Sequence, residues 1–138
     1  MEKKIRVGIY NKATTMEKGI IAWEKCKEYV KNNKNMEIVK CYGDFYPRNV
    51  KIQNRMGLKH LLKESEQLQL DLIVIASMKN ATRKTEEFIW LDKNFKKLNL
   101  DSFFVEEKVS GKELFPKMKI LDAVKILDEE PENQMMLN

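Results

Sequence analysis

Two short polar segments of this chain place cationic side chains beside hydroxyl groups, and one further arginine lies between them in the sequence. The residues are Lys12 with Thr14 and Thr15, then Arg55, then Lys79 and Asn80 with Thr82 and Arg83. Phosphoryl chemistry needs such a set, because cations neutralise the non-bridging phosphate oxygens while a hydroxyl can attack phosphorus. If the segments fold together, they can surround one phosphate. If they do not, they are solvated basic loop ends with no common target.

The apolar patterns predict the elements that must position these segments. Strands are predicted over residues 5–10, 36–42, 70–77 and 102–105. Helices are predicted over residues 16–32 and 54–67, around Phe88, Leu91, Phe95 and Leu98, and in a short last segment ending near Leu127. The first helix is expected to bury Ile20, Trp23, Cys26 and Val30. Residues 43–53 and 108–116 are predicted to be connections.

The unbroken apolar run at 72–76 is typical of a strand covered on both faces. The predicted fold class is therefore α/β, with a mostly parallel sheet of about four to five strands flanked by helices. In such sheets, ligands bind where the carboxyl ends of the strands meet. Both polar segments directly follow predicted strands, so we expect the functional site at that edge.

Composition excludes several classes of protein. The 138 residues, 43% hydrophobic and 34% charged, fit one globular domain. The longest apolar run is far shorter than the ~20 residues of a membrane helix. With two Cys and one His, neither a disulfide scaffold nor a Cys/His zinc site is expected. The sequence contains no glycine-rich phosphate loop. We therefore expect a cytoplasmic protein without a cofactor or a metal.

The net charge of +5 is unevenly distributed along the chain. Residues 117–138 carry three Lys against five acidic residues, a net charge of −2, which leaves +7 on the first 116 residues. A basic body of this kind suits a polyanionic partner such as DNA.

Four motifs, taken in order, carry a resemblance to a known family. Residues 10–15 read Tyr-Asn-Lys-Ala-Thr-Thr, 42–44 read Tyr-Gly-Asp, 55–58 read Arg-Met-Gly-Leu and 78–83 read Met-Lys-Asn-Ala-Thr-Arg. Over about residues 4–127 the chain resembles the catalytic domain of the serine recombinases, the resolvase/invertase family. The corresponding family motifs are Tyr-x-Arg-x-Ser-Thr, Tyr-x-Asp, Arg-Pro-Gly-Leu and Leu-Asp-Arg-Leu-x-Arg.

The resemblance implies a three-layer resolvase-like fold and site-specific DNA recombination. In the family, a serine hydroxyl attacks a DNA phosphodiester without a metal and becomes covalently linked to it, while arginines stabilise the phosphorane. The resemblance assigns catalytic positions to Thr14, Lys12, Arg55 and Arg83, and phosphate contacts to Lys12, Arg55, Lys79, Asn80 and Arg83.

Several of these positions depart from the family pattern. Thr14 keeps the hydroxyl, but its β-methyl group restricts χ1, and Lys12 lacks the bidentate fork of arginine. Lys79 reverses the charge of the family aspartate, and Asn80 lacks the charge of the family arginine. Because removing one preorganised donor from a transition state can cost ~10²–10³-fold in rate, we predict a retained fold with weak or no strand cleavage.

Such a domain would act by binding DNA weakly or by binding an active recombinase. Two other interpretations stay open: an active minimal enzyme that uses Thr14, and an unrelated α/β module that binds a protein or ligand.

The last part of the chain is predicted to divide at residue 127. Residues 1–127 form the resolvase-like domain, and residues 128–138 form an acidic, disordered tail. The last predicted helix carries an apolar stripe of Ile120, Leu121, Val124 and Leu127. This stripe must pack either on the chain's own sheet or on a partner, and family analogy makes it a homodimer surface.

Overall fold

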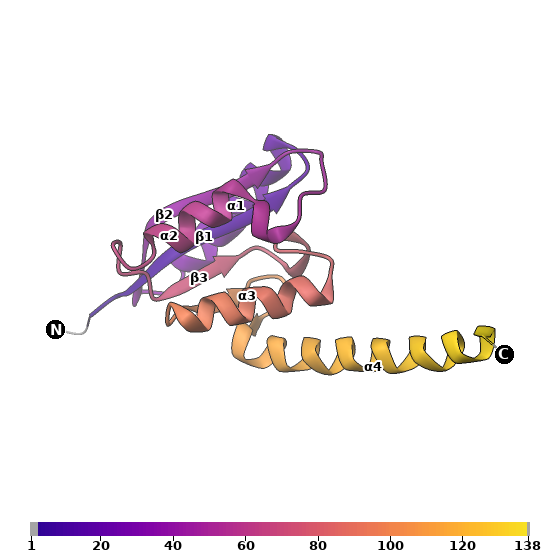
Figure 1. Ribbon diagram of the computed structural model, residues 1–138. Helices are drawn as coiled ribbons and strands as arrows, with labels where there is room; N and C mark the ends of the chain where they lie inside the picture. Colours follow the sequence, from indigo (N-terminus) through magenta and orange to yellow (C-terminus); the bar gives the residue numbers. More distant parts are fainter. Residues whose placement is uncertain (1–2, 138) are drawn as a thin grey trace.

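A sheet in the order β2-β1-β3-β4-β5 forms the middle layer of the computed structural model, which describes the backbone of residues 3–137 and the side chains of residues 3–124 (Figure 1). The strands are β1 (Ile5–Ala13), β2 (Met36–Phe45), β3 (Leu72–Ile75), β4 (Asp101–Phe104) and β5 (Val109–Ser110). β1 pairs in parallel with β2 and β3, and β3 with β4, whereas β5 is antiparallel to β4. The predicted α/β class with a mostly parallel sheet is confirmed.

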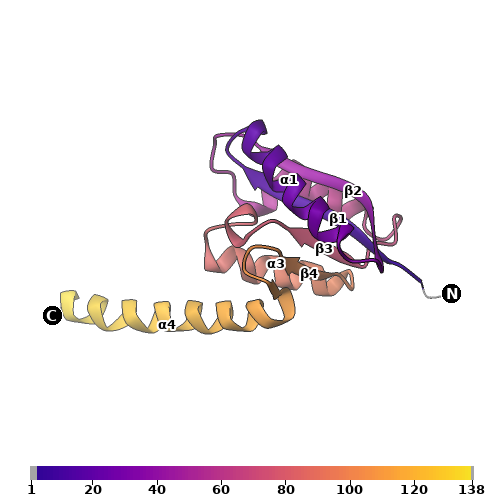
Figure 2. The same ribbon diagram turned by 180° about the vertical axis from the view of Figure 1, so that it is seen from behind.

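Helices cover both faces of this sheet, which makes the fold three-layered (Figure 2). They are α1 (Met16–Lys31), α2 (Met56–Glu64), α3 (Thr85–Lys97) and α4 (Gly111–Leu137), with short 3₁₀ turns η1 (Ile52–Asn54) and η2 (Met78–Asn80). Side chains alternate between the two faces of a strand. In β3, Val74 therefore packs with the α1 layer, while Ile73 and Ile75 pack in the core on the side of α2 and α3.

Helix α1 begins where its sequence predicts, but the residues that it buries in its first half differ from those expected. The Thr15 hydroxyl accepts a hydrogen bond from the Lys18 amide at 3.1 Å and caps the helix. Cys26 and Val30 are buried as expected, but the prediction for Ile20 is wrong because 46% of its surface is exposed. Gly19 faces inward instead, against the Phe45 ring, where an added Cβ would lie 2.5 Å from the ring.

The C-terminal region corrects the predicted connection at residues 108–116, which instead contains β5 and the start of α4. The buried face of α4 consists of Leu114, Phe115 and Met118. These side chains pack in the core that α3 and β4 share.

Side chains Ile120, Leu121 and Val124 of the predicted stripe are 46–64% exposed, so they do not pack on the chain's own sheet. The side chain of Leu127 lies outside the described residues. Helix α4 continues to Leu137, beyond the end predicted near Leu127. Assigning residues 128–138 to a separate tail stays a prediction. Among the residues that the structure describes, no helix is long and apolar enough to cross a membrane.

Candidate functional site

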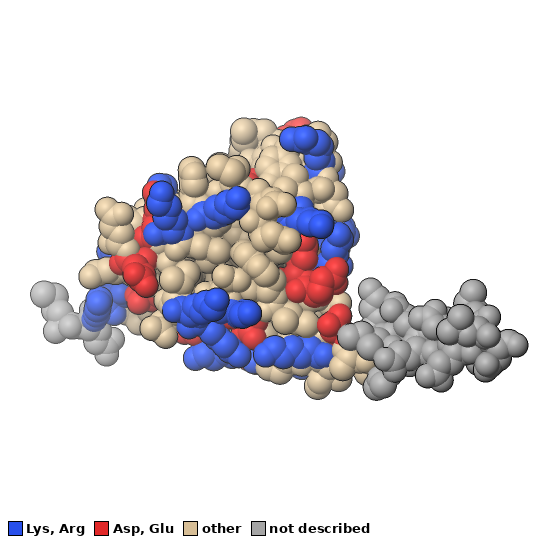
Figure 3. All heavy atoms as spheres, viewed as in Figure 1, with Lys and Arg blue, Asp and Glu red and all other residues tan. Residues whose placement is uncertain are grey.

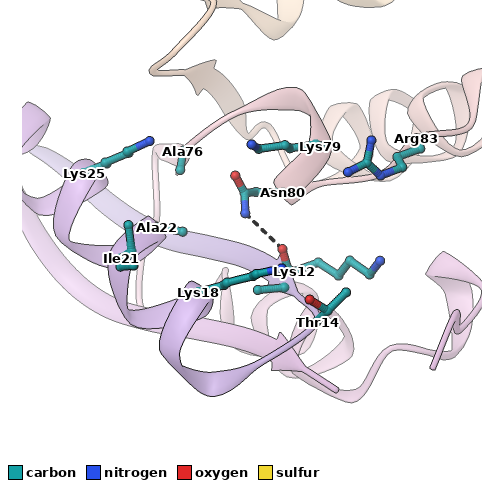
Figure 4. A pocket seen from close by; sticks show the side chains of 11 residues that line it. Lys12, Thr14, Lys18, Ile21, Ala22, Lys25, Ala76, Lys79, Asn80 and Arg83 are labelled. Carbon is teal, nitrogen blue, oxygen red and sulfur yellow. Dashed lines mark hydrogen bonds between the residues drawn. The ribbon is translucent and has the colours of Figure 1, made fainter. Parts of the chain in front are cut away.

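The carboxyl ends of β1 and β3 meet at a pocket of about 360 Å³ between α1 and η2 (Figure 4). Of the sequence-predicted site residues, the structure brings Lys12, Thr14, Lys79, Asn80 and Arg83 into its lining. Thr14 is solvent-exposed at the end of β1, two residues before α1 begins. Two polar segments far apart in sequence therefore share one cavity, at the sheet edge where parallel strands place ligands.

Two asparagine side chains form hydrogen bonds between β1 and the segment that follows β3. The Nδ2 of Asn80 donates to the Lys12 carbonyl at 3.1 Å, the dashed line in Figure 4, while its Oδ1 accepts from the Ser77 hydroxyl at 2.7 Å. The buried Asn11 accepts from the Ala76 amide at 2.9 Å. Asn80, predicted to contact phosphate, thus has both ends of its amide engaged in holding η2 against β1.

The pocket is strongly cationic. Five of its lining side chains are basic: Lys12, Lys18, Lys25, Lys79 and Arg83. Burial lowers the pKa of Lys12, and the nearby charges of Arg55 and Arg83 lower it further. None of the described residues that line the pocket is acidic. A bound anion would relieve the repulsion among these cations.

One carboxylate does stand beside the pocket. Glu106 accepts a hydrogen bond from Lys25 at 3.0 Å, and this bond lowers the pKa of Glu106. Both side chains are about half exposed, so the pair contributes little and can exchange for another anion.

Arg55 is absent from the described lining of the pocket. Its side chain is only 1% exposed. The guanidinium donates to the carbonyls of Ala81 and Val50, and its Nη2 lies 3.5 Å from Oε1 of Glu87. Arg55 therefore acts on the pocket through its positive charge, which together with burial lowers the pKa of Lys12.

Asp44, which the sequence matched only as part of the Tyr-Gly-Asp motif, connects β2 to the start of α2 by hydrogen bonds. Its carboxylate accepts hydrogen bonds from the backbone amides of Gly57 at 2.8 Å and Leu58 at 3.0 Å. It also accepts from the Tyr10 hydroxyl at 2.8 Å. A carboxylate from β2 thus satisfies the open amides at the N-terminus of α2 and sets the position of Arg55, which precedes that helix.

Sequence analysis missed the contribution of α1 to the pocket. Lys18, Ile21, Ala22 and Lys25 all line it. Ile21, Ala22 and Lys25 follow Lys18 by three, four and seven residues, and this spacing places all four on one face of a helix. The helical period could therefore have identified this face if the helix had been expected beside the site.

One broad face of the molecule mixes basic residues with acidic ones. On the face seen in Figure 3, Lys and Arg side chains alternate with Asp and Glu side chains. On α3, for example, Asp92 pairs with Lys96 at 3.2 Å and with Lys119 of α4 at 3.3 Å. The pocket differs from this face in gathering cations around one hollow.

The described lining combines several cations, which could bind a phosphate, with the exposed hydroxyl of Thr14. The described lining contains no carboxylate and no histidine to accept the proton of the Thr14 hydroxyl. Among the described residues, no group of three or more His, Cys, Asp or Glu side chains could hold a metal ion.

Comparison with known proteins finds likeness in three dimensions only. No protein family and no curated protein matches the chain by sequence. The N-terminal catalytic domain of TP901-1 integrase superposes with a TM-score of 0.73 at 16% identity, covering 92% of this chain and 98% of that one. A resolvase family site-specific recombinase from Streptococcus pneumoniae gives 0.72 at 16% identity, covering 97% and 94%.

The C-terminal catalytic domain of ISC1926 TnpA, an IS607-like serine recombinase, gives a TM-score of 0.60 at 20% identity, covering 88% of this chain and 79% of that one. At these identities the likeness concerns the fold. The chain has the fold of serine recombinase catalytic domains, and the resemblance predicted from its sequence is confirmed at that level.

Proposed function

We propose that this chain is a serine recombinase-like domain that binds the phosphate backbone of DNA at its cationic pocket and has weak or no strand-cleavage activity. The observation that carries the proposal is the pocket itself, where five basic side chains surround one hollow whose described lining is free of carboxylates. Cations placed in this way bind phosphate whatever the base sequence.

The same side chains support the loss of cleavage. The family uses several guanidinium groups around the reacting phosphate, but here Arg83 is the one arginine among the described lining residues. Arg55 is buried against Glu87, and the Asn80 amide holds η2. Lysine supplies charge without the planar fork that fixes a phosphate's oxygens. Charge for binding is present, while geometry for transition-state stabilisation is reduced.

The binding half of the proposal is tested by titrating labelled duplex DNA with the full chain over about 50–200 mM salt. The logarithm of the binding constant should fall linearly with the logarithm of salt concentration, by roughly 0.9 for each phosphate contacted. Lys79→Ala should reduce that slope by about 1. The matched control is Lys97→Ala, an exposed lysine at the far end of α3, which should leave the slope unchanged. A flat salt response would overturn the proposal.

The cleavage half is tested by an assay for covalent protein–DNA adducts on supercoiled and oligonucleotide substrates. We expect no adduct above background. An adduct that disappears in Thr14→Ala would establish the opposite, an active enzyme that uses Thr14.

A second candidate role, pairing with another recombinase-like chain, is favoured by the exposed apolar side chains of α4. Ile120, Leu121 and Val124 form an exposed apolar stripe, and such stripes mark protein interfaces. The partner is either a second copy or an active recombinase. Sedimentation of the chain alone and mixed with an active recombinase distinguishes these cases, and Leu121→Lys should abolish either association. A monomer in both samples would contradict this role.

A further inference from the structure

One wall of the cationic pocket is apolar, which binding of a phosphate alone does not require. Ile21, Ala22 and Ala76 line the hollow together with the basic residues. Ile21 keeps 55% of its surface exposed although it faces a cavity. The cavity of about 360 Å³ falls at the lower end of the ~300–1,000 Å³ range of ligand sites. Both its size and its lining exceed what one phosphate group would use.

The apolar residues lie together on the side of the pocket that Lys25 borders, away from Lys12 and Arg83. In Figure 4, Ile21, Ala22 and Ala76 lie at one side, while Lys12 and Arg83 lie at the other. A ligand that fills both parts has a flat or apolar body joined to an anionic group.

Helix α1 places a cation at each end of the apolar wall. Lys18 and Lys25 are seven residues apart, about 10 Å along the helix axis, with Ile21 and Ala22 between them on the same face. Lys25 is held by a surface ion pair with Glu106, and a phosphate can replace that carboxylate at little cost. A ligand with an anionic group on both sides of its apolar body therefore fits this face.

We propose that the pocket receives one unpaired nucleotide of a single nucleic-acid strand, with its base against Ile21, Ala22 and Ala76 and its phosphate at Lys12 and Arg83. The next phosphate of the strand lies at Lys25. The inference rests on the proposed function, because it assigns to the same pocket the form of nucleic acid that fills it. In a duplex the base is stacked inside the helix, so only an unpaired base can contact the apolar wall.

The size of the effect follows from the apolar surface that a base would bury. Removing roughly 50–60 Å² of apolar surface from water strengthens binding about tenfold. We therefore expect a short single strand to bind about tenfold more tightly than the same strand with its bases removed. It should also bind more tightly than the duplex of equal length.

The experiment measures fluorescence anisotropy of three labelled probes of equal length with the full chain at fixed salt. The probes are a single-stranded oligothymidylate, an abasic single strand and a duplex. The test variant is Ile21→Ser, and its matched control is Ile20→Ser, a neighbour that is also exposed but absent from the described pocket lining. Ile21→Ser should reduce binding of the oligothymidylate to the level of the abasic strand, while Ile20→Ser should leave it unchanged.

Each other outcome overturns a defined part of the proposal. Equal affinity for the base-bearing and abasic strands, with both weakened by salt, would refute recognition of a base and leave phosphate binding intact. Equal affinity for the single strand and the duplex would refute the preference for unpaired nucleotides. Absence of binding to all three probes would refute the proposed function as well.

Discussion

Replacing Glu87 by Gln tests whether Arg55 belongs to the protein interior or to the phosphate site. Glu87 is buried, and its carboxylate faces Arg55 at 3.5 Å. It also accepts hydrogen bonds from the Thr82 hydroxyl and from the Ile52 amide. Glu87→Gln removes the only carboxylate that the structure shows paired with this guanidinium among the described residues, while keeping the size and most of the shape of the side chain.

The expected loss of stability is large. Removing one partner of a buried ion pair costs about 3–5 kcal/mol, because the remaining charge stays buried without compensation. Arg55, at 1% exposure, cannot recover solvation without moving. Small domains unfold at a cost of about 5–15 kcal/mol, so the variant would lose a substantial part of its stability. With a urea m-value of about 2 kcal/mol/M, the midpoint should fall by roughly 2 M.

The matched control is Glu86→Gln, an exposed carboxylate in the same first turn of α3. Its loss should cost less than about 1 kcal/mol, since it contributes through the helix dipole. The double variant Arg55→Met with Glu87→Gln should lose less stability than the sum of the losses in the two single variants, because removing both charges leaves no unpaired buried charge. Additive effects, or a Glu87→Gln cost under about 1 kcal/mol, would mean that Arg55 is free to contact a phosphate, as the family resemblance implies.

Three further predictions follow from close packing and burial. Gly57→Ala should lower the thermal midpoint by an amount corresponding to about 1–3 kcal/mol, because the added Cβ would lie 2.3 Å from the Gly43 carbonyl oxygen; an unchanged midpoint would contradict this close approach. Burial lowers the pKa of Lys12 below 10.5, so the folded chain releases this proton at a lower pH than the unfolded chain. The protonated Lys12 should therefore destabilise the folded state fully below its folded-state pKa, and this destabilisation should vanish toward pH 10.5. In urea unfolding, the free energy of unfolding of the wild type should rise relative to that of Lys12→Met as the pH rises. Burial raises the pKa of the Cys26 thiol to about 12, so this thiol should react with a disulfide reagent only after unfolding. The measurement uses a Cys41→Ser variant, because Cys41 is the other cysteine and is only half-buried; rapid reaction of that variant in its native state would refute the burial of Cys26.

The strands could be predicted because their residue types reflect burial. The run at 72–76 is apolar on successive positions, and β3 is covered on both faces. Strand β5 has no such pattern, because it consists of two residues whose pairing depends on β4 lying alongside. Tertiary contacts, and not local preference, create an element of that length.

The buried face of α1 shows a second limit of pattern reading. Periodicity favours bulky apolar residues and therefore selected Ile20. The sheet, however, approaches α1 closely enough that Gly19 and Ala22 face it, and Ile20 is turned outward. Small residues carry little hydrophobic weight in a sequence pattern, although they decide how closely two layers can pack.

Part of the site could be predicted for a topological reason. The end of β1 and the segment after β3 meet because neighbouring parallel strands end at the same edge, so Lys12, Thr14, Lys79 and Arg83 come together. The location of Arg55 could not be predicted in this way. The residue type gives the charge of Arg55 but does not show which carboxylate will pair with it. Glu87 lies beside Arg55 because the start of α3 packs against η1.

The two halves of the proposed function separate because phosphate binding and phosphate cleavage depend on different properties of the same side chains. Long-range attraction depends on the number of positive charges, and the pocket gathers five of them, two contributed by α1. Transition-state stabilisation depends on donors held in fixed directions. Lysine carries a point charge without a planar fork of donors, Arg55 is oriented toward Glu87, and the Asn80 amide is hydrogen-bonded to Lys12 and Ser77. We therefore expect lysine in place of arginine at position 12 to weaken catalysis far more than binding, so that a domain with this pocket would hold a nucleic-acid strand without cutting it.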